Sequence, residues 1–128
     1  MTNFINNTKR IIHEAMLMMQ EPTYSTLNEM AQITGKKSKF SFIVQINSED
    51  HTPPHMHFID KKTNKLLCKI AITENFPKTV DDIYDITELY LSISFRKEVL
   101  KWANSLNKRK VSYWLAAQLE WDHLHPED

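Results

Sequence analysis

The sequence predicts one compact α+β domain, in which a three-stranded antiparallel sheet packs on C-terminal helices and is preceded by an N-terminal helical extension. Between residues 40 and 72, apolar and polar side chains alternate with the two-residue period of half-buried strands. On both sides of this region, apolar residues recur at three- and four-residue steps, as in helices that face a core. A chain of 128 residues fits one domain, divided here into an extension, 1–38, and an α+β region, 39–128.

The N-terminal extension is predicted to contain two helices. Residues 3–20 carry apolar side chains at helical spacing, and Pro22 follows them. A short second helix is predicted from Thr26, which fits a capping box with Glu29, to Gly35, which suits the position just after a helix. The apolar surface of the methionine-rich first helix is broader than one core contact needs. We therefore expect it to bind a protein partner or a second copy of the chain.

Three strands are predicted next, over residues 40–47, 55–59 and 66–72. The polar turns between them, 48–52 and 61–65, are too short for a crossover connection. The strands are therefore expected to be antiparallel neighbours.

Two helices are predicted to follow the sheet. Ser94 suits the N-cap of a helix that ends near Leu106, and a last helix is expected from about Val111 to Trp121. Before them, Thr79 is expected to begin a short helical turn. Residues 86–93 fit a helix and a strand equally well.

The composition excludes several classes of protein. The single cysteine, Cys68, excludes an internal disulfide and a four-thiolate zinc site. The single glycine, Gly35, excludes glycine-rich phosphate-binding loops. Sixteen basic residues balance sixteen acidic ones, so the net charge attracts neither nucleic acid nor anionic membrane. The longest apolar run, 15–19, is too short to cross a bilayer, and the polar start does not resemble a secretion signal, so we expect a cytoplasmic protein without membrane contact.

The most distinctive segment runs from Asp50 to His57 and reads Asp-His-Thr-Pro-Pro-His-Met-His. The two prolines, Pro53 and Pro54, stiffen the entry into the second strand. In a strand, His55 and His57 project from the same face and can ligate one divalent metal ion. The predicted ligand set is His51, His55 and His57, with His51 or Asp50 from the loop as the further ligand or base. The alternative is structural, with rings that hydrogen-bond carbonyls and carboxylates at a sheet edge.

A second histidine pair, His123 and His125, lies at the chain end. It could approach the first pair and complete a site, with Asp122 orienting a ring nitrogen. The alternative is that this tail caps the last helix.

Basic residues cluster in three short segments. If the clusters converge, they could line a nucleic-acid groove; otherwise they decorate solvated turns. They comprise Lys36, Lys37, Lys39, Lys61, Lys62, Lys65, Lys108, Arg109 and Lys110.

The stretch from Phe40 to Trp114 resembles the small bacterial proteins grouped as domain of unknown function four-one-six-zero. The resemblance rests on one tryptophan in each C-terminal helix, Trp102 and Trp114, and on a loop-and-strand signature. The signature residues are Asp50, His51, Pro53, Pro54, His55 and His57. Relative to the family pattern, Met56 replaces an aromatic residue, residues 73–94 form an insertion and residues 1–38 are an extension. The resemblance implies a component of a toxin–antitoxin-like or mobile-element locus, with no settled activity.

These observations favour a non-enzymatic interaction module whose anchor surfaces are the first helix and residues 73–94. The alternatives are a metal-dependent protein of hydrolase or nuclease type, which uses the histidine motif, and a nucleic-acid binder. The only cofactor expected is a divalent metal ion. The sequence contains no nucleophile elbow, paired catalytic carboxylates or zincin helix.

Overall fold

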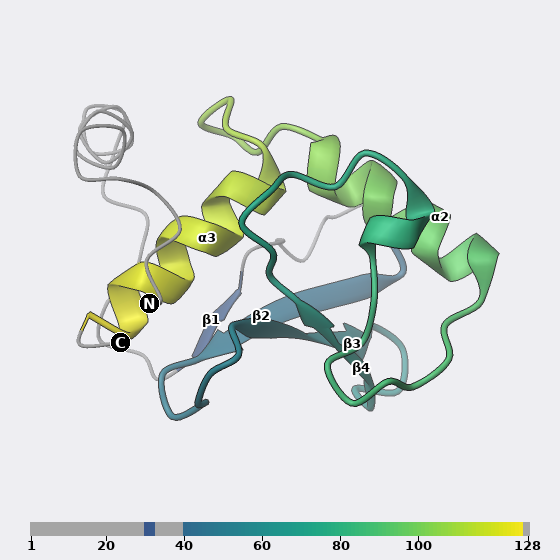
Figure 1. Cartoon of the computed structure of the whole chain (residues 1–128), viewed down its shortest axis with the longest axis horizontal. Coiled ribbons are helices and arrows are strands. Elements are labelled where there is room, and N and C mark those ends of the chain that lie inside the picture. The colour runs from purple at the N-terminus through teal and green to yellow at the C-terminus, as the bar shows by residue number, and fades with distance from the viewer. Residues whose placement is uncertain (1–29, 33–39, 127–128) are drawn as a thin grey trace.

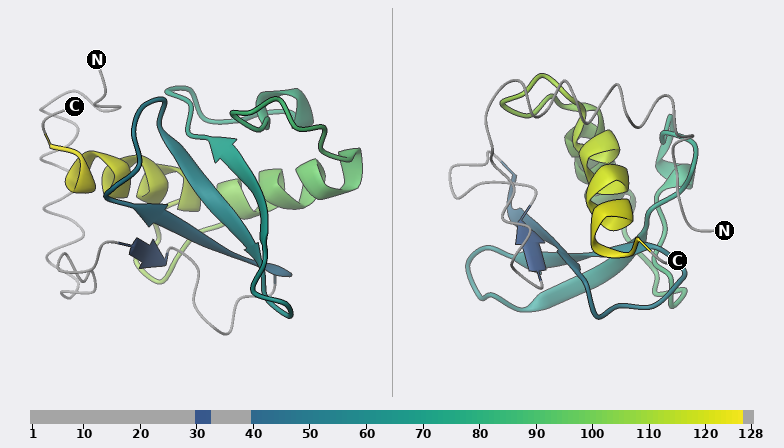
Figure 2. Two further views of the ribbon diagram at one scale, coloured as in Figure 1. Left: turned by 90° about the horizontal axis from the view of Figure 1, so that it is seen from below. Right: turned by 90° about the vertical axis from the view of Figure 1, so that its left-hand side faces the viewer.

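The computed structural model describes residues 30–32 and 40–126 and has an α+β fold. Its antiparallel sheet has the order β1-β2-β3-β4, and two helices cover one face of it (Figures 1 and 2). The elements are β1 (Met30–Gln32), β2 (Phe42–Asn47), β3 (His55–Asp60), β4 (Leu66–Ala71), a 3-10 turn η1 (Val80–Asp82), α2 (Ile93–Asn104) and α3 (Tyr113–Leu124).

The three predicted strands are confirmed and form the main part of the sheet. In the β2–β3 pair, Gln45 lies opposite His57, and in the β3–β4 pair His55 lies opposite Ala71. Their alternation places Val44, Met56 and Phe58 in the core, all fully buried. The side chains of His55 and His57 therefore leave β3 on the face opposite to Met56 and Phe58, as the two-residue period predicts.

The strand β1 corrects the prediction of a second helix from Thr26 to Gly35. Residues Met30–Gln32 instead pair antiparallel with the end of β2, where Ala31 lies opposite Ile46. Pairing with a sheet edge satisfies the backbone groups of these residues, and such long-range bonds readily override a weak local helical preference. The predicted first helix, 3–20, lies outside the described residues.

Both C-terminal helices are confirmed, with corrected starts. The N-cap of α2 is Ser92, whose side chain accepts a hydrogen bond from the Phe95 amide (3.2 Å), and not Ser94. The N-cap of α3 is Ser112, and the helix continues beyond Trp121 to Leu124. Serines suit helix starts in general, so spacing alone does not choose between neighbouring candidates.

The segment that joins β4 to α2 contains the predicted turn after Thr79. The Asp82 carboxylate accepts hydrogen bonds from the amides of Lys78 (2.8 Å) and Thr79 (3.0 Å), which stabilises η1. Residues 86–92 form neither a helix nor a strand.

The core lies between the sheet and the helices. The rings of Phe42 and Phe58 meet Trp102 edge-on, with centroids 6.2 and 5.3 Å away. Trp102, Trp114 and Trp121 are all fully buried, so they belong to the core. Burial raises the pKa of the Cys68 thiol to about 12, which makes it an unreactive core residue.

Candidate metal centre

The loop between β2 and β3 lies beneath the C-terminal end of α3 (Figure 1). Its start is an Asx turn, in which the Asn47 side chain accepts the Glu49 amide at 2.8 Å and the Asn47 carbonyl accepts the Asp50 amide at 3.2 Å. Its end is held because Pro54 accepts a hydrogen bond from the Ile72 amide at 2.9 Å. The loop therefore enters β3 in a defined geometry, through a cis Thr52–Pro53 peptide.

Three side chains of the motif meet at this loop. Asp50 Oδ2 lies 3.2 Å from His55 Nε2 and 3.0 Å from His57 Nε2. The two imidazole rings are stacked, with centroids 5.3 Å apart and planes inclined by 16°. One carboxylate oxygen and two ring nitrogens therefore all lie within 4.8 Å of one another.

The tautomer of His55 follows from its other nitrogen. His55 Nδ1 lies 2.9 Å from the Pro53 carbonyl, which only accepts, so Nδ1 carries the hydrogen. In the neutral ring, the Nε2 lone pair then faces the Asp50 carboxylate oxygen. Two acceptors this close repel each other unless a proton or a metal ion lies between them. The Pro53 carbonyl thus orients the ring as backbone carbonyls orient metal-bound histidines.

The contact between Asp50 and His57 also favours a proton or a metal ion between the two side chains. Asp50 Oδ2 and His57 Nε2 are buried atoms that lack a hydrogen-bond partner of acceptable geometry within the described part of the chain, although they are only 3.0 Å apart. The pKa of His57 is lowered overall: burial lowers it most, the charges of His55 and Lys69 lower it further, and the charge and close contact of Asp50 raise it. A neutral imidazole with its lone pair free is the form that ligates a metal.

The two distances from the Asp50 oxygen to the histidine nitrogens suit a small divalent ion, and the three ligand atoms together lie within 4.8 Å. Zinc binds nitrogen and oxygen ligands at about 2.0–2.2 Å, which separates adjacent tetrahedral ligand atoms by roughly 3.3–3.6 Å. The two measured separations from Asp50, 3.0 and 3.2 Å, are within a few tenths of an ångström of this range. Two histidines and one carboxylate form a donor set used for Zn²⁺ and for non-haem Fe²⁺.

The other motif histidine does not join this group. His51 is exposed and lies outside the cluster, so Asp50 supplies the loop's side chain. Among the C-terminal residues, His123 is exposed and Asp122 is fully buried on α3.

Of that second pair, His125 reaches the site, through the backbone of the loop. Its Nε2 lies 2.9 Å from the Asp50 carbonyl, and its Nδ1 lies 2.9 Å from the Trp121 carbonyl. The His125 ring also stacks on Trp121, with ring centroids 3.7 Å apart. The centroid of the Trp121 ring lies 5.8 Å from that of His55. Both nitrogens of His125 face carbonyls, so the residue supports the Asp50 loop against α3 and does not present a ligand atom.

The predicted nucleic-acid contacts that fall within the described residues lie on two separate connections of the chain. Lys36, Lys37 and Lys39 lie outside the described residues. Lys61, Lys62 and Lys65 lie in or beside the β3–β4 turn. In the α2–α3 connection, Lys108 and Lys110 are exposed, whereas Arg109 is only 6% exposed and has little surface to offer a phosphate.

Comparisons of the chain with protein families, curated proteins and solved structures found no match. None of the helices in the described ranges is long and apolar enough to cross a membrane. The fold and the site therefore define a small α+β protein with a two-histidine, one-carboxylate cluster, and its function is inferred from that geometry.

Proposed function

We propose that this chain is a divalent-metal-binding protein in which Asp50, His55 and His57 hold one ion. The observation that carries the proposal is the Asp50 oxygen placed 3.2 and 3.0 Å from two imidazole Nε2 atoms. The orientation of His55 supports it, because a ring lone pair that faces a carboxylate needs a proton or a metal ion between them.

The donor set favours a transition metal over Mg²⁺ or Ca²⁺, which prefer ligands that are all oxygen. Three protein ligands leave at least one position for water, and a bound ion would lower the pKa of that water toward 7, which is the chemistry of metal-dependent hydrolysis. The side chains of Asp50 and His57 are 20% and 17% exposed, against 6% for His55. The exposed surface of the cluster therefore lies on the Asp50 and His57 side, while the facing atoms Asp50 Oδ2 and His57 Nε2 are themselves buried.

The direct test is a Zn²⁺ titration of the full chain after chelator treatment, followed by calorimetry and thermal unfolding. We expect one ion per chain. At about a hundredfold excess over Kd, an unfolding midpoint higher by on the order of 10 °C is expected. Co²⁺ in place of Zn²⁺ should give the absorption bands of a nitrogen- and oxygen-ligated ion.

The matched control is His51→Ala, because His51 belongs to the same motif but is exposed and outside the cluster. It should bind Zn²⁺ as the natural chain does. Binding that is not stoichiometric, or that disappears in His51→Ala, would reject the proposed ligand set.

A second prediction concerns the support that His125 gives to the loop. His125→Ala removes the contact to the Asp50 carbonyl, so Asp50 should be held less firmly, and Zn²⁺ affinity should fall about 10- to 100-fold. His123→Ala, which removes an exposed histidine two residues away, should leave the affinity unchanged. Equal affinities in both variants would show that the loop does not depend on α3.

The second candidate function is the interaction module, and the observation that favours it is exposed apolar surface on residues 73–93. Five large side chains are exposed there: Phe76, Tyr84, Leu89, Tyr90 and Ile93. The resemblance to domain of unknown function four-one-six-zero supports a partner from a paired locus and remains a proposal. Nucleic-acid binding and a cytoplasmic location also remain predictions.

A further inference from the structure

The segment between β4 and α2 presents a surface with an unusual composition. We call residues 73–92 the acidic-aromatic surface. Its exposed large side chains are Tyr90 (80%), Leu89 (53%), Tyr84 (51%) and Phe76 (43%). Tyrosines and other aromatic residues are enriched where proteins bind proteins.

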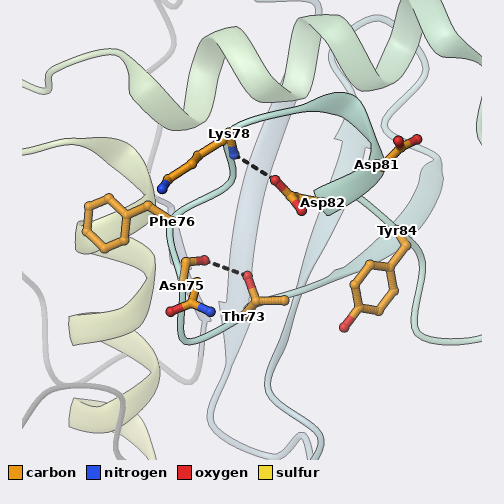
Figure 3. A pocket seen from close by; sticks show the side chains of 7 residues that line it. All are labelled: Thr73, Asn75, Phe76, Lys78, Asp81, Asp82 and Tyr84. Atoms are coloured by element: carbon orange, nitrogen blue, oxygen red, sulfur yellow. Dashed lines mark hydrogen bonds between the residues drawn. The ribbon is translucent and has the colours of Figure 1, made fainter.

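This surface is hollowed on both sides of Tyr84. One cavity, of about 580 Å³, lies between Phe76 and Tyr84, with Thr73, Asn75, Lys78 and Asp82 around it (Figure 3). The other, of about 350 Å³, is lined by Tyr84, Glu88, Leu89 and Tyr90, and Arg96 also forms part of its wall. Tyr84 thus stands between two adjoining recesses that an extended chain can enter with neighbouring side chains.

The segment that forms this surface is strongly acidic in a chain that is neutral overall, and four of its five acidic residues are exposed, since Asp85 is buried. Residues 73–92 contain five acidic side chains and one basic side chain, a formal charge of −4, whereas the whole chain has a net charge of 0. The acidic residues are Glu74, Asp81, Asp82, Asp85 and Glu88, and the basic one is Lys78.

Nearby positive charge compensates this only in part. Arg96, at the start of α2, lies 3.8 Å from Asp81, but its guanidinium also donates to the Leu91 carbonyl (3.1 Å) and the Val80 carbonyl (3.4 Å). The side chain of Asp81 remains 90% exposed, and Glu88 is exposed beside the second recess. Charge complementarity therefore favours a basic ligand and disfavours phosphate or anionic lipid.

The segment is also held in place before any partner binds. Its backbone bonds to β4, from the Ala71 amide to the Tyr84 carbonyl (3.0 Å) and from the Ile86 amide to the Lys69 carbonyl (2.9 Å). From α3, the Gln118 side chain donates to the carbonyls of Thr73 (2.9 Å) and Glu74 (3.0 Å). A preorganised surface loses little entropy on binding.

We propose that the acidic-aromatic surface binds a basic, extended segment of a partner protein. Arginine or lysine side chains of that segment stack on Tyr84 and Phe76 and pair with Asp81 and Glu88, while apolar neighbours pack on Leu89 and Tyr90. This interaction surface goes beyond metal binding, since it uses none of the residues at the metal centre.

The test is an NMR titration of the uniformly labelled full chain with a peptide of about twelve residues that alternates arginine with leucine. We expect amide shifts confined to residues 73–92 and binding that weakens with salt. The same peptide with glutamate for arginine should bind at least about 10-fold more weakly.

Substitutions distinguish peptide binding at this surface from nonspecific electrostatic binding elsewhere on the protein. Glu88→Lys and Leu89→Ala should each weaken peptide binding about 5-fold or more. The matched controls, Glu49→Lys and Leu106→Ala, change equally exposed side chains elsewhere and should have no effect.

Four outcomes would overturn the proposal. Shifts outside residues 73–92, or equal losses in the controls, would place the peptide elsewhere. Concentration-dependent broadening of the same residues without peptide would assign the surface to a second copy of the chain. Stronger binding of the glutamate peptide would contradict the charge argument. Chelator-treated and Zn²⁺-loaded protein should behave alike, so this test does not depend on the metal proposal.

Discussion

Asp50→Asn is expected to weaken Zn²⁺ binding by about 100-fold or more, which corresponds to roughly 3 kcal/mol. The substitution keeps the size of the side chain and removes the negative charge that faces both His55 Nε2 and His57 Nε2. An amide oxygen is a weaker ligand for a transition metal than a carboxylate, and two neutral imidazoles alone leave the ion underligated. Calorimetric titration of the chelator-treated proteins measures the loss.

The neighbouring residue provides a control of equal charge. Glu49→Gln removes one negative charge from the same loop, but Glu49 is exposed and outside the cluster. It should keep the natural affinity within about 2-fold, because exposed charges are strongly screened. If both variants lose affinity equally, the loop attracts the ion by its overall charge and Asp50 is not a ligand.

The same variant distinguishes the metal centre from a purely structural cluster. If a proton joins Asp50 to the histidines, Asp50→Asn removes a buried charged hydrogen bond and destabilises the metal-free protein. If a metal ion joins them, the main loss appears only in the presence of Zn²⁺. Chemical unfolding of both proteins, with and without Zn²⁺, therefore separates the two. A loss confined to the metal-free protein would reject the metal centre.

Local periodicity was sufficient to predict the sheet and the shared face of His55 and His57. The two-residue period of β2 to β4 determines which side chains enter the core, and that pattern is visible in the residues themselves. β1 was not predictable in this way, because its strand conformation depends on the backbone edge of β2, about fifteen residues away.

Which loop side chain joins the histidine cluster was equally inaccessible to sequence reasoning. Asp50 and His51 are adjacent and chemically suitable, and the structure turns Asp50 inward and leaves His51 exposed. Part of what positions the loop is His125, which contacts the Asp50 carbonyl from 75 residues further along the chain. A contact of this kind has no signal in local spacing, although the pairing of His123 with His125 did suggest that one of them would reach the site.

The helix α3 contains a buried carboxyl group that helical spacing did not reveal. Spacing predicted one inward face, but all nine residues from Trp114 to Asp122 are buried. Among them is Glu120, which is 5% exposed, and burial raises the pKa of its carboxyl group to about 7. A helix buried on every side places its polar residues in the interior along with its apolar ones.

Glu120 should make the protein less stable as the pH rises. From about pH 4.5, the ordinary pKa of a glutamate side chain, the unfolded chain releases the Glu120 proton, whereas the folded chain keeps it until about pH 7, the raised pKa of the buried group. The folded state therefore binds more protons in this range, and its stability falls by up to an amount on the order of 3 kcal/mol by about pH 8. Glu120→Gln stays neutral throughout and should be the more stable protein at about pH 8, with near equality at about pH 4.

Urea unfolding of both proteins at the two pH values measures this difference, and every other titrating group cancels because both proteins contain it. The exposed residue Glu74 supplies the control, since Glu74→Gln should shift stability by less than about 0.5 kcal/mol at either pH. A constant gap between Glu120→Gln and the natural chain would show that the carboxyl group ionises alike in both states. A difference in the free energy of unfolding that grows with pH would show that ionisation of Glu120 destabilises α3 in alkaline solution. The same helix holds the Asp50 loop through His125.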